Sequence, residues 1–477
     1  MSFATPLFLW YFMPVVLAAV LIAPRSWRNG VVAVASLWFY ASGAGATTLL
    51  LLACMVVNYL SGPHLEPDRL DANRQRRRAL LLAVIGFDLA VLVVWKYAGF
   101  ATEQFADLAK LFGADLAVLH LVLPIGISFY TFHHISYVVD VYRGERTALR
   151  NPVSFVTYIA MFPQLVAGPI VRFREISDQL PQKRTHRLDD IASGFPRFTL
   201  GLCKKVIIAD SLGPMVDACF ATPPDQMTFG IAWLGAIGYT LQLYFDFSGY
   251  SDMAIGLGRM LGFRLPENFA RPYSSVTITE FWRRWHMSLS RWFRDYVYIP
   301  LGGNRRGVAR TYRNLGIVFV LTGFWHGANW TFLVWGLYHG ALLVLERRFG
   351  WDSSPGTRVA RIVRRALTML LVLVGWVFFK ASSMGVALTM LGHMLVPDFS
   401  GLSDAVGAAT TNQRVLILLV ALAIVVLPDH PVTGPFLESS RATTATVLRI
   451  SVMTAGLVYA SILIASGTFS PFLYYQF

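Results

Sequence analysis

The chain contains 477 residues, of which 55% are hydrophobic and only 14% carry a charge, and its mean hydropathy is +0.52. A soluble protein of this length needs more charge to cover its surface, so the composition excludes an ordinary set of soluble domains and is typical of a polytopic helical membrane protein. The net charge of +14 does not indicate a nucleic-acid partner, because the arginines lie in short loops between apolar runs, as they do on the cytoplasmic side of membrane proteins.

Long apolar runs recur along the whole chain. We expect membrane segments at residues 6–23, 30–42, 46–61, 79–100, 121–144, 152–171, 195–212, 229–262, 314–345, 366–380, 415–427 and 446–466. An amphipathic stretch at 102–115 is expected outside the membrane. With hairpins and bent segments counted, the runs predict an all-α polytopic bundle of about 10–13 membrane segments.

The first apolar run, residues 6–23, is followed by Arg25 and Arg28 and not by a small-residue cleavage site. We therefore predict a retained first helix and not a signal peptide that is removed. Since basic loops mark the cytoplasmic side, the two arginines place the N-terminus outside. The runs at 30–42 and 46–61 then form a hairpin that returns to the cytoplasmic side.

Three runs do not fit a straight crossing. The run at 121–144 is interrupted by a proline and a glycine. Residues 152–171 also contain such breaks and have basic loops at both ends. Because a simple crossing cannot have both ends on one side, we predict a re-entrant or bent segment there. Residues 314–345 are too long for one crossing of about 20 residues, so we predict a hairpin that turns near Gly327–Asn329.

No internal repeat is visible, which counts against a transporter built from inverted repeats. We predict one membrane domain over residues 1–477. Within it, residues 268–313 form a polar, aromatic and basic segment that we place at the interfacial or cytoplasmic surface, because tryptophans gather at the headgroup level. An aromatic tail covers residues 470–477.

His326 is the one titratable residue of the apolar stretch LTGFWHGANWTFLVW, residues 321–335. A lone histidine in a membrane helix is often a packing partner, and that interpretation stays open. Intramembrane ionisable groups are costly, however, and tend to face an internal cavity. Burial favours the neutral imidazole, which is the form that a general base needs. Gly323 and Gly327 beside it would let a second backbone or a substrate approach closely.

Arginines and tryptophans interleave in the stretch EFWRRWHMSLSRWFRDYVYIPLGGN, which lies within 268–313. An interfacial belt explains these two residue types. It does not explain His286, which is followed by the apolar Met287 and Leu289. The spacing therefore singles out two histidines, His286 and His326, forty residues apart.

Two further groups of polar residues lie inside apolar runs. Asp246 and Asp252 are six residues apart, which puts them on different faces of a helix. We therefore favour hydrogen-bonded helix packing over a metal site for them. His133 and His134 are adjacent and point in different directions on a helix, so a joint ligand role is weak.

The sequence lacks the signatures of several other classes of site. It has no nucleophile elbow, phosphate loop or HExxH zinc motif. Cys54, Cys203 and Cys219 make neither a disulfide framework nor a metal pattern, and we expect them to be packed core residues. We predict no metal site.

A series of long motifs, taken in order, resembles the membrane-bound O-acyltransferase family. The motifs are PIGISFYTFHHISYVVDVYRG, PQLVAGPIVRF, YTLQLYFDFSGYSDMAIGLGRMLGF, ENFARPY, TEFWRRWHMSLSRWFRDYVYIPLGGNR, YRNL and GFWHGANWTFLVWGLYHG. The likeness extends over nearly the whole chain, and within the family it is similar to the alginate O-acetyltransferase branch.

The resemblance implies a bundle of helices around a central funnel or tunnel that pierces the membrane. It places the family's catalytic histidine, at the narrowest point of the tunnel, at His326. The family's second polar residue maps to His286, which we predict as a second catalytic residue, and a role in positioning the donor stays open. His339 is expected to have a packing role. We expect donor or tunnel contacts from Arg283, Arg284, Trp325, Asn329 and Asp246.

The resemblance also implies an activity and its partners. Similar proteins take an acetyl group from a cytoplasmic donor, here acetyl-CoA. The resemblance also implies a multi-pass protein of the bacterial inner membrane, and we expect no bound cofactor. A periplasmic SGNH-like acetyltransferase partner would place the group on an exported polysaccharide such as alginate or cellulose, beside the export machinery. The basic loops would suit the phosphates of coenzyme A, although membrane orientation alone explains them.

The ending SPFLYYQF resembles the aromatic tails of this branch. The resemblance implies that a tyrosine phenol in the tail carries the acyl group to the partner, and by its place in the motif this residue is Tyr474 and not Tyr475. An aromatic anchor at the membrane interface is the alternative, and both stay open.

The sequence leaves two other functions to be tested. One is an acyltransferase that acts on another acceptor, such as teichoic acid, a lipid or a protein. The other is a transporter or channel in which His326 gates a polar path, and it would move substrate without consuming acetyl-CoA.

Overall fold

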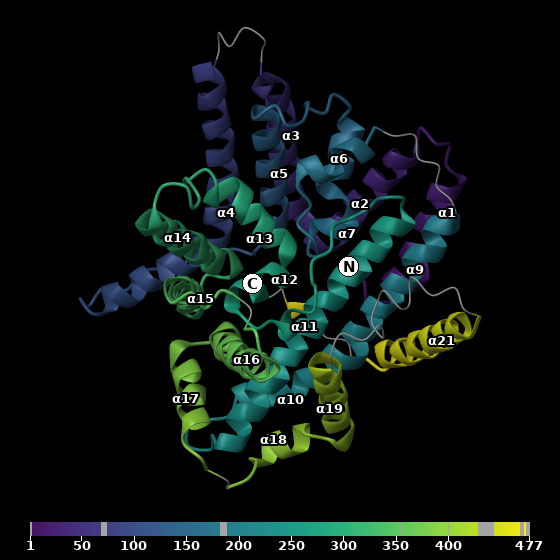
Figure 1. Cartoon of the computed structure of the whole chain (residues 1–477). Helices are drawn as coiled ribbons and strands as arrows, with labels where there is room; N and C mark the ends of the chain where they lie inside the picture. The colour runs from purple at the N-terminus through teal and green to yellow at the C-terminus, as the bar shows by residue number, and fades with distance from the viewer. Residues whose placement is uncertain are drawn as a thin grey trace. The chain divides into compact units, whose positions relative to one another are not determined.

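The computed structural model describes residues 2–67, 74–181, 188–353, 355–398, 400–427, 443–467 and 472–473. Among these residues every regular element is a helix (Figure 1), so the predicted all-α fold is confirmed. The chain divides into two compact units. Unit 1 comprises Met1–Phe195 and Ala254–Pro266, and unit 2 comprises Pro196–Met253 and Glu267–Phe477. A single membrane domain over 1–477 stays a prediction.

Unit 1 contains the N-terminal helices, together with the first part of α9 (Leu188–Cys203) and the last part of α11 (Phe229–Met260). Its other helices are η1 (Phe8–Phe12), α1 (Met13–Ile22), α2 (Arg28–Ala44), η2 (Gly45–Thr47), α3 (Thr48–Leu65), α4 (Arg74–Lys110), α5 (Ile127–Tyr142), α6 (Pro152–Ala160), α7 (Phe162–Leu165), α8 (Phe173–Ile176) and η3 (Ser177–Gln179). Within this unit α5 packs against both α3 and α4, and α2 packs against α6.

Helix α4 differs from the sequence prediction. We expected an apolar crossing at 79–100 and a separate segment at 102–115, but α4 continues without a break to Lys110. Residues 101–110, ATEQFADLAK, are mostly good helix formers, so nothing in the sequence ends the helix at residue 100. The helix therefore extends beyond its apolar stretch.

The irregular runs of unit 1 are interrupted where the sequence predicts. Helix α5 begins at Ile127, directly after Gly126, whose φ of 74° is a left-handed conformation that glycine adopts readily. The run at 152–171 is divided among α6, α7 and an irregular, non-helical stretch, and most of it is buried. At the break, the Phe162 N–H donates a hydrogen bond to Ser36 Oγ at 3.1 Å. Such partners inside the protein are the condition for non-helical backbone at membrane depth.

Unit 2 contains most of α11 and the helices that follow it. Its other helices are η4 (Lys204–Asp210), α10 (Ser211–Phe220), η5 (Pro272–Ser274), α12 (Ile278–Arg284), α13 (Met287–Phe293), η6 (Arg294–Tyr298), α14 (Val308–His326), α15 (Trp330–Arg348), α16 (Arg358–Lys380), α17 (Met384–Leu395), α18 (Asp404–Ala409), α19 (Asn412–Val426) and α21 (Thr443–Ala465). Within this unit α15 packs against α12, α14 and α16.

Helices α14 and α15 form the predicted hairpin, which turns at Gly327–Asn329. The Asn329 side chain caps α15 by accepting a hydrogen bond from the Thr331 N–H at 3.0 Å. An amide or hydroxyl oxygen at this position satisfies a backbone donor that the first turn of a helix leaves open. The cap therefore sets where α15 begins, four residues after His326.

Glycines let the two helices of this hairpin touch. A Cβ added to Gly323 would lie 2.5 Å from the backbone oxygen of Phe332, and a Cβ added to Gly336 would lie 2.4 Å from the backbone oxygen of Phe319. The expected role of Gly323, close approach of a second backbone, is confirmed. Small residues commonly allow such contacts between membrane helices.

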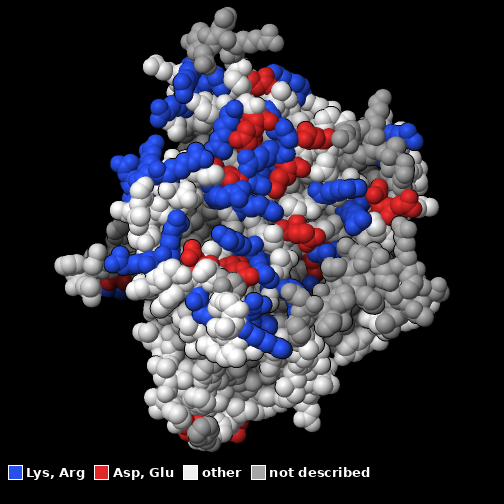
Figure 2. Space-filling view, viewed as in Figure 1, with Lys and Arg blue, Asp and Glu red and all other residues white. Residues whose placement is uncertain are grey.

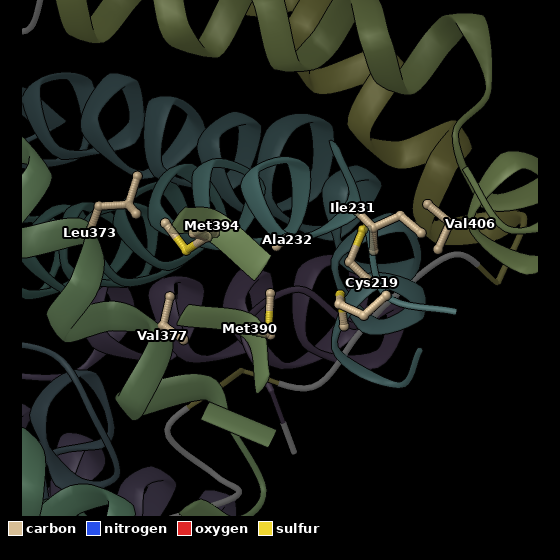
Figure 3. Close-up of a cluster of buried hydrophobic side chains, with 10 residues drawn as sticks. Cys219, Ile231, Ala232, Leu373, Val377, Met390, Met394 and Val406 are labelled. Atoms are coloured by element: carbon tan, nitrogen blue, oxygen red, sulfur yellow. The ribbon is translucent and has the colours of Figure 1, made fainter. Parts of the chain in front are cut away.

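A hydrophobic cluster in unit 2 is built from side chains of α10, α11, α16, α17 and α18 and of the loop before α11 (Figure 3). Its buried members are Cys219, Met227, Ile231, Ala232, Ala236, Leu373, Val377, Met390, Met394 and Val406. Cys54 in unit 1 is also buried, whereas Cys203 is half-buried, and all three cysteines are free thiols.

Several helices have the length and composition of membrane spans. Three helical stretches of the described chain are long and apolar enough to cross a membrane, namely Arg28–Leu65, Arg74–Lys110 and Arg358–Lys380. Shorter apolar helices cover Phe8–Ile22, Met384–Leu395, Asn412–Val426 and Ile450–Ala465. Leu388 and Leu395 of α17 are exposed, and the surface over α17 shows almost only uncharged side chains (Figure 2). Exposed apolar surface of this kind suits contact with lipid.

The tryptophans of the segment 268–313 do not form an exposed interfacial belt. Trp282, Trp285 and Trp292 are all buried. The ring of Trp282 packs against Trp335, and that of Trp285 packs against Trp376, at centroid distances of 5.7 Å and 4.8 Å. Packing in the interior of unit 2 therefore accounts for these rings, and the interfacial or cytoplasmic placement of the segment 268–313 stays a prediction. Composition does not show that this segment folds inward against α15 and α16.

Replacement of Gly336 by alanine tests the contact between α14 and α15. The added methyl group would meet a backbone oxygen, so the helices must separate, and we expect a loss of roughly 1–3 kcal/mol of stability, seen as a lower melting temperature. Gly316→Ala, in the neighbouring helix α14, is the matched control because no atom beyond its chain neighbours and its own helix backbone lies within 4 Å of its added Cβ. Equal melting temperatures for the two variants would contradict the close contact.

Candidate functional site

His326 is the last residue of α14 and is 3% exposed. Three aromatic rings surround its imidazole, at centroid distances of 4.8 Å to Trp325, 5.0 Å to Trp335 and 5.0 Å to Phe379. These rings come from α14, α15 and α16. The imidazole therefore faces the interior of unit 2, where an intramembrane histidine with a chemical role is expected.

His286 lies between α12 and α13 and is fully buried. Its backbone is left-handed, with φ 43° and ψ 53°. A residue other than glycine adopts this conformation at a cost of about 1–3 kcal/mol, and such residues cluster at functional sites. The Asn268 backbone oxygen accepts a hydrogen bond from the Met287 N–H at 2.9 Å, which holds the chain in this turn.

The side chain of Asn268 determines which nitrogen of His286 carries a hydrogen. Asn268 Oδ1 accepts hydrogen bonds from the Ser288 N–H at 3.2 Å and the Ser288 hydroxyl at 2.8 Å, and Asn268 Nδ2 donates to Ser251 Oγ at 3.0 Å. Because a backbone N–H can only donate, the amide oxygen and not the nitrogen must face Ser288. His286 Nδ1 lies 3.1 Å from the same oxygen and must therefore donate to it. In the neutral ring Nε2 is then the nitrogen that accepts a proton.

Burial keeps the His286 imidazole neutral. This residue lies outside the helices that could cross a membrane, and its burial lowers the pKa of the ring from 6.5 to about 3. The cause is desolvation, which penalises the charged form. At neutral pH the ring is therefore an uncharged base.

Trp325 connects the two histidines. Its ring lies 4.8 Å from the ring of His326 and 6.0 Å from that of His286. His286 also meets Phe247 of α11 edge-on, at 4.6 Å. The structure thus brings together two histidines that are far apart in sequence. We call the contacting rings of Phe247, His286, Trp325 and His326 the aromatic layer of unit 2. A tunnel that reaches this layer stays a prediction.

The two aspartates of α11 have different partners, as their spacing predicts. Asp246 pairs with Lys205 of η4 at 2.8 Å. Asp252 pairs with Arg197 at 2.7 Å and with Lys204 at 2.6 Å. The sequence predicted hydrogen-bonded helix packing, and the structure shows that the partners are charged: the pair of Asp246 with Lys205 is buried, and those of Asp252 with Arg197 and Lys204 are partly buried. A charge is kept in an apolar interior only when it is paired in this way.

Two residues of this region were missed by the sequence analysis. Lys205 is 2% exposed, and the signal for it was a cation inside the apolar run 195–212, where charge is costly. Asn268 lies in the motif ENFARPY, but its partners Ser251 and Ser288 are 17 and 20 residues away. Contacts at that separation leave no local pattern.

Of the expected donor or tunnel contacts, Arg284 and Asn329 have partners within unit 2. Arg284 pairs with Glu280 at 2.7 Å, and Asn329 donates a hydrogen bond to the Ser382 backbone oxygen at 3.0 Å. Arg283, in contrast, is exposed. Their contact with a donor stays a prediction.

Tyr474 lies outside the described residues. His133 and His134 have separate surroundings. In unit 1, the His133 ring lies 5.8 Å from that of Tyr158, whereas His134 Nδ1 lies 4.0 Å from Asp88 Oδ1. The adjacent histidines therefore point to different neighbours, as predicted.

His339 in unit 2 is buried between the rings of Trp282 and Trp335, at 5.2 Å and 5.3 Å. These contacts fit the packing role expected for it. Across the described ranges, no three His, Cys, Asp or Glu side chains come together as a metal site would require.

Comparison with known proteins adds independent information. Residues 144–388, which include both histidines of the aromatic layer, match the model of the MBOAT, membrane-bound O-acyltransferase family. The chain is 44% identical to the probable alginate O-acetylase AlgI of Azotobacter vinelandii over the whole of both chains. It is 37% identical to the peptidoglycan O-acetyltransferase of Helicobacter pylori, over 82% of this chain and 79% of that protein. It is 30% identical to the teichoic acid D-alanyltransferase of Bacillus subtilis, over 55% and 69%.

The ring state of His286 can be measured by nitrogen NMR of protein labelled with ¹⁵N-histidine. We expect the Nδ1–H form, with no protonation between about pH 8 and about pH 5, because a lowered pKa postpones protonation until the pH falls toward 3. His286→Gln identifies the signal, and Asn268→Leu, which removes the acceptor, should allow both neutral forms. A ring that titrates near its ordinary pKa, or that carries its hydrogen on Nε2, would contradict this arrangement.

Proposed function

The chain belongs to the membrane-bound O-acyltransferase family, and on this premise we propose that it transfers acetyl groups from acetyl-CoA toward an exported polysaccharide. Family membership makes the protein a multi-pass membrane enzyme that transfers acyl groups to oxygen. The donor, the direction of transfer, the acceptor and the catalytic residues go beyond that assignment.

The contact of two buried imidazoles with one indole ring, that of Trp325, supports this function most directly. An acyl transfer needs a base that is neutral at working pH, in a site from which water is excluded so that the donor is not hydrolysed. His326 and His286 are both enclosed by aromatic rings in unit 2. These surroundings meet both requirements.

In the proposed reaction His326 is the general base. Its imidazole takes the proton of the acceptor hydroxyl while that oxygen attacks the thioester carbonyl carbon. The new C–O ester bond forms as the C–S bond breaks, and the proton passes to the departing sulfur, so coenzyme A leaves as the thiol. His286, whose ring orientation depends on Asn268, orients the reacting groups through Nε2.

Coenzyme A requires cationic contacts on the cytoplasmic side. Arg283 is exposed on α12, three residues before His286, whereas the neighbouring Arg284 is paired with Glu280. We therefore assign a donor phosphate contact to Arg283 rather than to Arg284, since a guanidinium binds phosphate oxygens well. No metal ion or bound cofactor takes part in this proposal.

The names of the relatives support a polymer acceptor. They describe acyl transfer involving alginate, peptidoglycan and teichoic acid. The relative that covers the whole chain is the alginate protein, so an exopolysaccharide of that kind, alginate or cellulose, is the acceptor that we propose. Teichoic acid is a second candidate acceptor. It ranks below an exopolysaccharide because the similarity to the D-alanyltransferase covers only part of the chain.

Transfer to an exported polymer requires the acetyl group to cross the inner membrane. We propose that Tyr474 accepts it as a phenol ester and presents it on the outer side. A periplasmic SGNH-like acetyltransferase beside the export machinery then moves it to the polymer. The aromatic tail resembles that of chains in which this relay is expected, and a membrane anchor is the competing role.

Removal of the base tests the catalytic assignment. In membrane vesicles supplied with labelled acetyl-CoA, His326→Ala should lower label transfer by about 10²–10⁴-fold, which is the usual contribution of a positioned general base. His286→Ala should also lower it. His393→Ala is the control, since this half-buried histidine lies in α17, away from the aromatic layer. Normal transfer by stably inserted His326→Ala would end the assignment.

The relay is tested by removing one phenol oxygen at a time. Tyr474→Phe keeps the ring that an anchor needs, so under the relay model it should abolish both the label on the protein and the acetylation of the polymer. Tyr475→Phe, the adjacent control, should transfer normally. Unchanged polymer acetylation in Tyr474→Phe would leave the tail as an anchor only.

A further inference from the structure

Two apolar residues close to the end of the chain are buried in unit 2. Phe472 is 0% exposed and Leu473 is 6% exposed. In Figure 1 the short yellow segment that follows α21 in the sequence lies beside α11. Burial of both side chains means that the neighbouring elements of unit 2 contact them.

The contacts come from one stretch of α11. The ring of Phe472 stacks on that of Tyr250, at 4.3 Å and an interplanar angle of 25°, and lies 5.8 Å from the ring of Phe247. The Leu473 N–H donates a hydrogen bond to Asp246 Oδ2 at 3.0 Å. Asp246 and Tyr250 are four residues apart and share a face of the helix.

The charges around Asp246 explain why it binds a backbone donor. Its Oδ1 pairs with Lys205 at 2.8 Å, and Lys205 also pairs with Asp210. Two carboxylates thus share one ammonium, and all three groups are at least nine-tenths buried. A buried carboxylate oxygen needs hydrogen-bond donors because water does not reach it. The Leu473 amide supplies one.

Plain hydrophobic packing does not account for these charges. Well-packed apolar side chains in place of a buried ion pair often leave a protein equally stable or more stable. An apolar residue at position 246 would therefore suffice to cover Phe472. The carboxylate adds a directional contact that places one particular backbone amide.

The same stretch of α11 connects the tail to the aromatic layer. Phe247 contacts Phe472 at 5.8 Å and His286 at 4.6 Å, so one ring separates the tail from the histidine. The Leu473 amide that Asp246 holds therefore lies beside the stretch of α11 that reaches the aromatic layer.

We propose that Lys205, Asp246, Phe247 and Tyr250 form a tail-binding site for the chain's own C-terminal segment, and that Asp246 is a positioning residue for the part of the tail that follows Leu473. The positioning role rests on the proposed function, because only a tail that receives the acyl group has to be aligned. Binding of the tail does not depend on it.

Binding can be measured by the reaction of a cysteine introduced at position 473 with a maleimide. Leu473→Cys keeps the backbone N–H, and the parent chain with its three native cysteines is the blank. We expect slow labelling when only Leu473→Cys is present. Adding Asp246→Asn or Tyr250→Leu should speed labelling by roughly 10- to 100-fold, as expected when a hydrogen bond to a charged group or a buried ring contact is lost.

The controls separate tail release from general damage. Asp252→Asn removes a similarly buried carboxylate of α11 that pairs with Arg197 and Lys204 and not with the tail, so the introduced thiol should stay protected. Tyr250→Phe keeps the stacked ring and should also leave that thiol protected. Global unfolding would expose Cys219, which mass spectrometry detects separately. Equal labelling of the introduced thiol in the Asp246→Asn, Tyr250→Leu and Asp252→Asn variants overturns the tail-binding site.

The positioning role has its own readout. In the vesicle assay, Asp246→Asn should lower the label on the protein by a factor similar to its effect on the protection of the introduced thiol, while Asp252→Asn should not. If Asp246→Asn releases the tail but leaves acyl transfer unchanged, the positioning role is wrong and the proposed function stands. If the parent chain takes no label from acetyl-CoA, the proposed function fails, and the cysteine result still decides whether the tail is bound.

Discussion

Polar groups that leave water must find partners inside the protein, and this constraint determines the arrangement around His286. Asn268 provides two such partners. Its backbone oxygen holds the left-handed turn at His286, and its side-chain oxygen accepts the hydrogen of the imidazole. Because Ser288 donates to the same oxygen, the amide cannot turn over without losing a backbone partner. One buried amide thus couples the shape of the chain to the proton state of a candidate catalytic ring.

The position of His326 depends on a different constraint, which is steric. Gly323 and Gly336 bring the backbones of α14 and α15 into contact, and this contact holds the end of α14 against the rings of α15 and α16. Trp325 then lies within reach of both histidines. The hydrogen bonds of Asn268 position His286, and the close packing of α14 and α15 positions His326, so both histidines lie in the same aromatic layer. An acyl-transfer site requires such surroundings, because they exclude water.

Helix α11 carries two buried carboxylates that serve different purposes. Asp252 has two cations of its own, Arg197 and Lys204, so its charge is satisfied within the fold. Among the described residues, Asp246 pairs with Lys205, which also pairs with Asp210, and Asp246 accepts a hydrogen bond from the backbone of Leu473. The difference in local charge balance explains why one aspartate only joins helices while the other also holds the tail close to His286.

Run length, glycine and proline are local signals, so the sequence was enough to predict the all-α class, the breaks before α5 and after α6 and the turn at Gly327–Asn329. An isolated imidazole is also a local signal, and it singled out the two histidines as candidates. The sequence did not show that the tryptophans of 268–313 pack inward, since composition is the same for an exposed belt and an inward-folded segment. It also missed Asn268 and Lys205. Their contacts become visible only in the folded chain, because each has its partners on other segments, and a hydrogen bond or an ion pair depends on distances in space that no periodicity records.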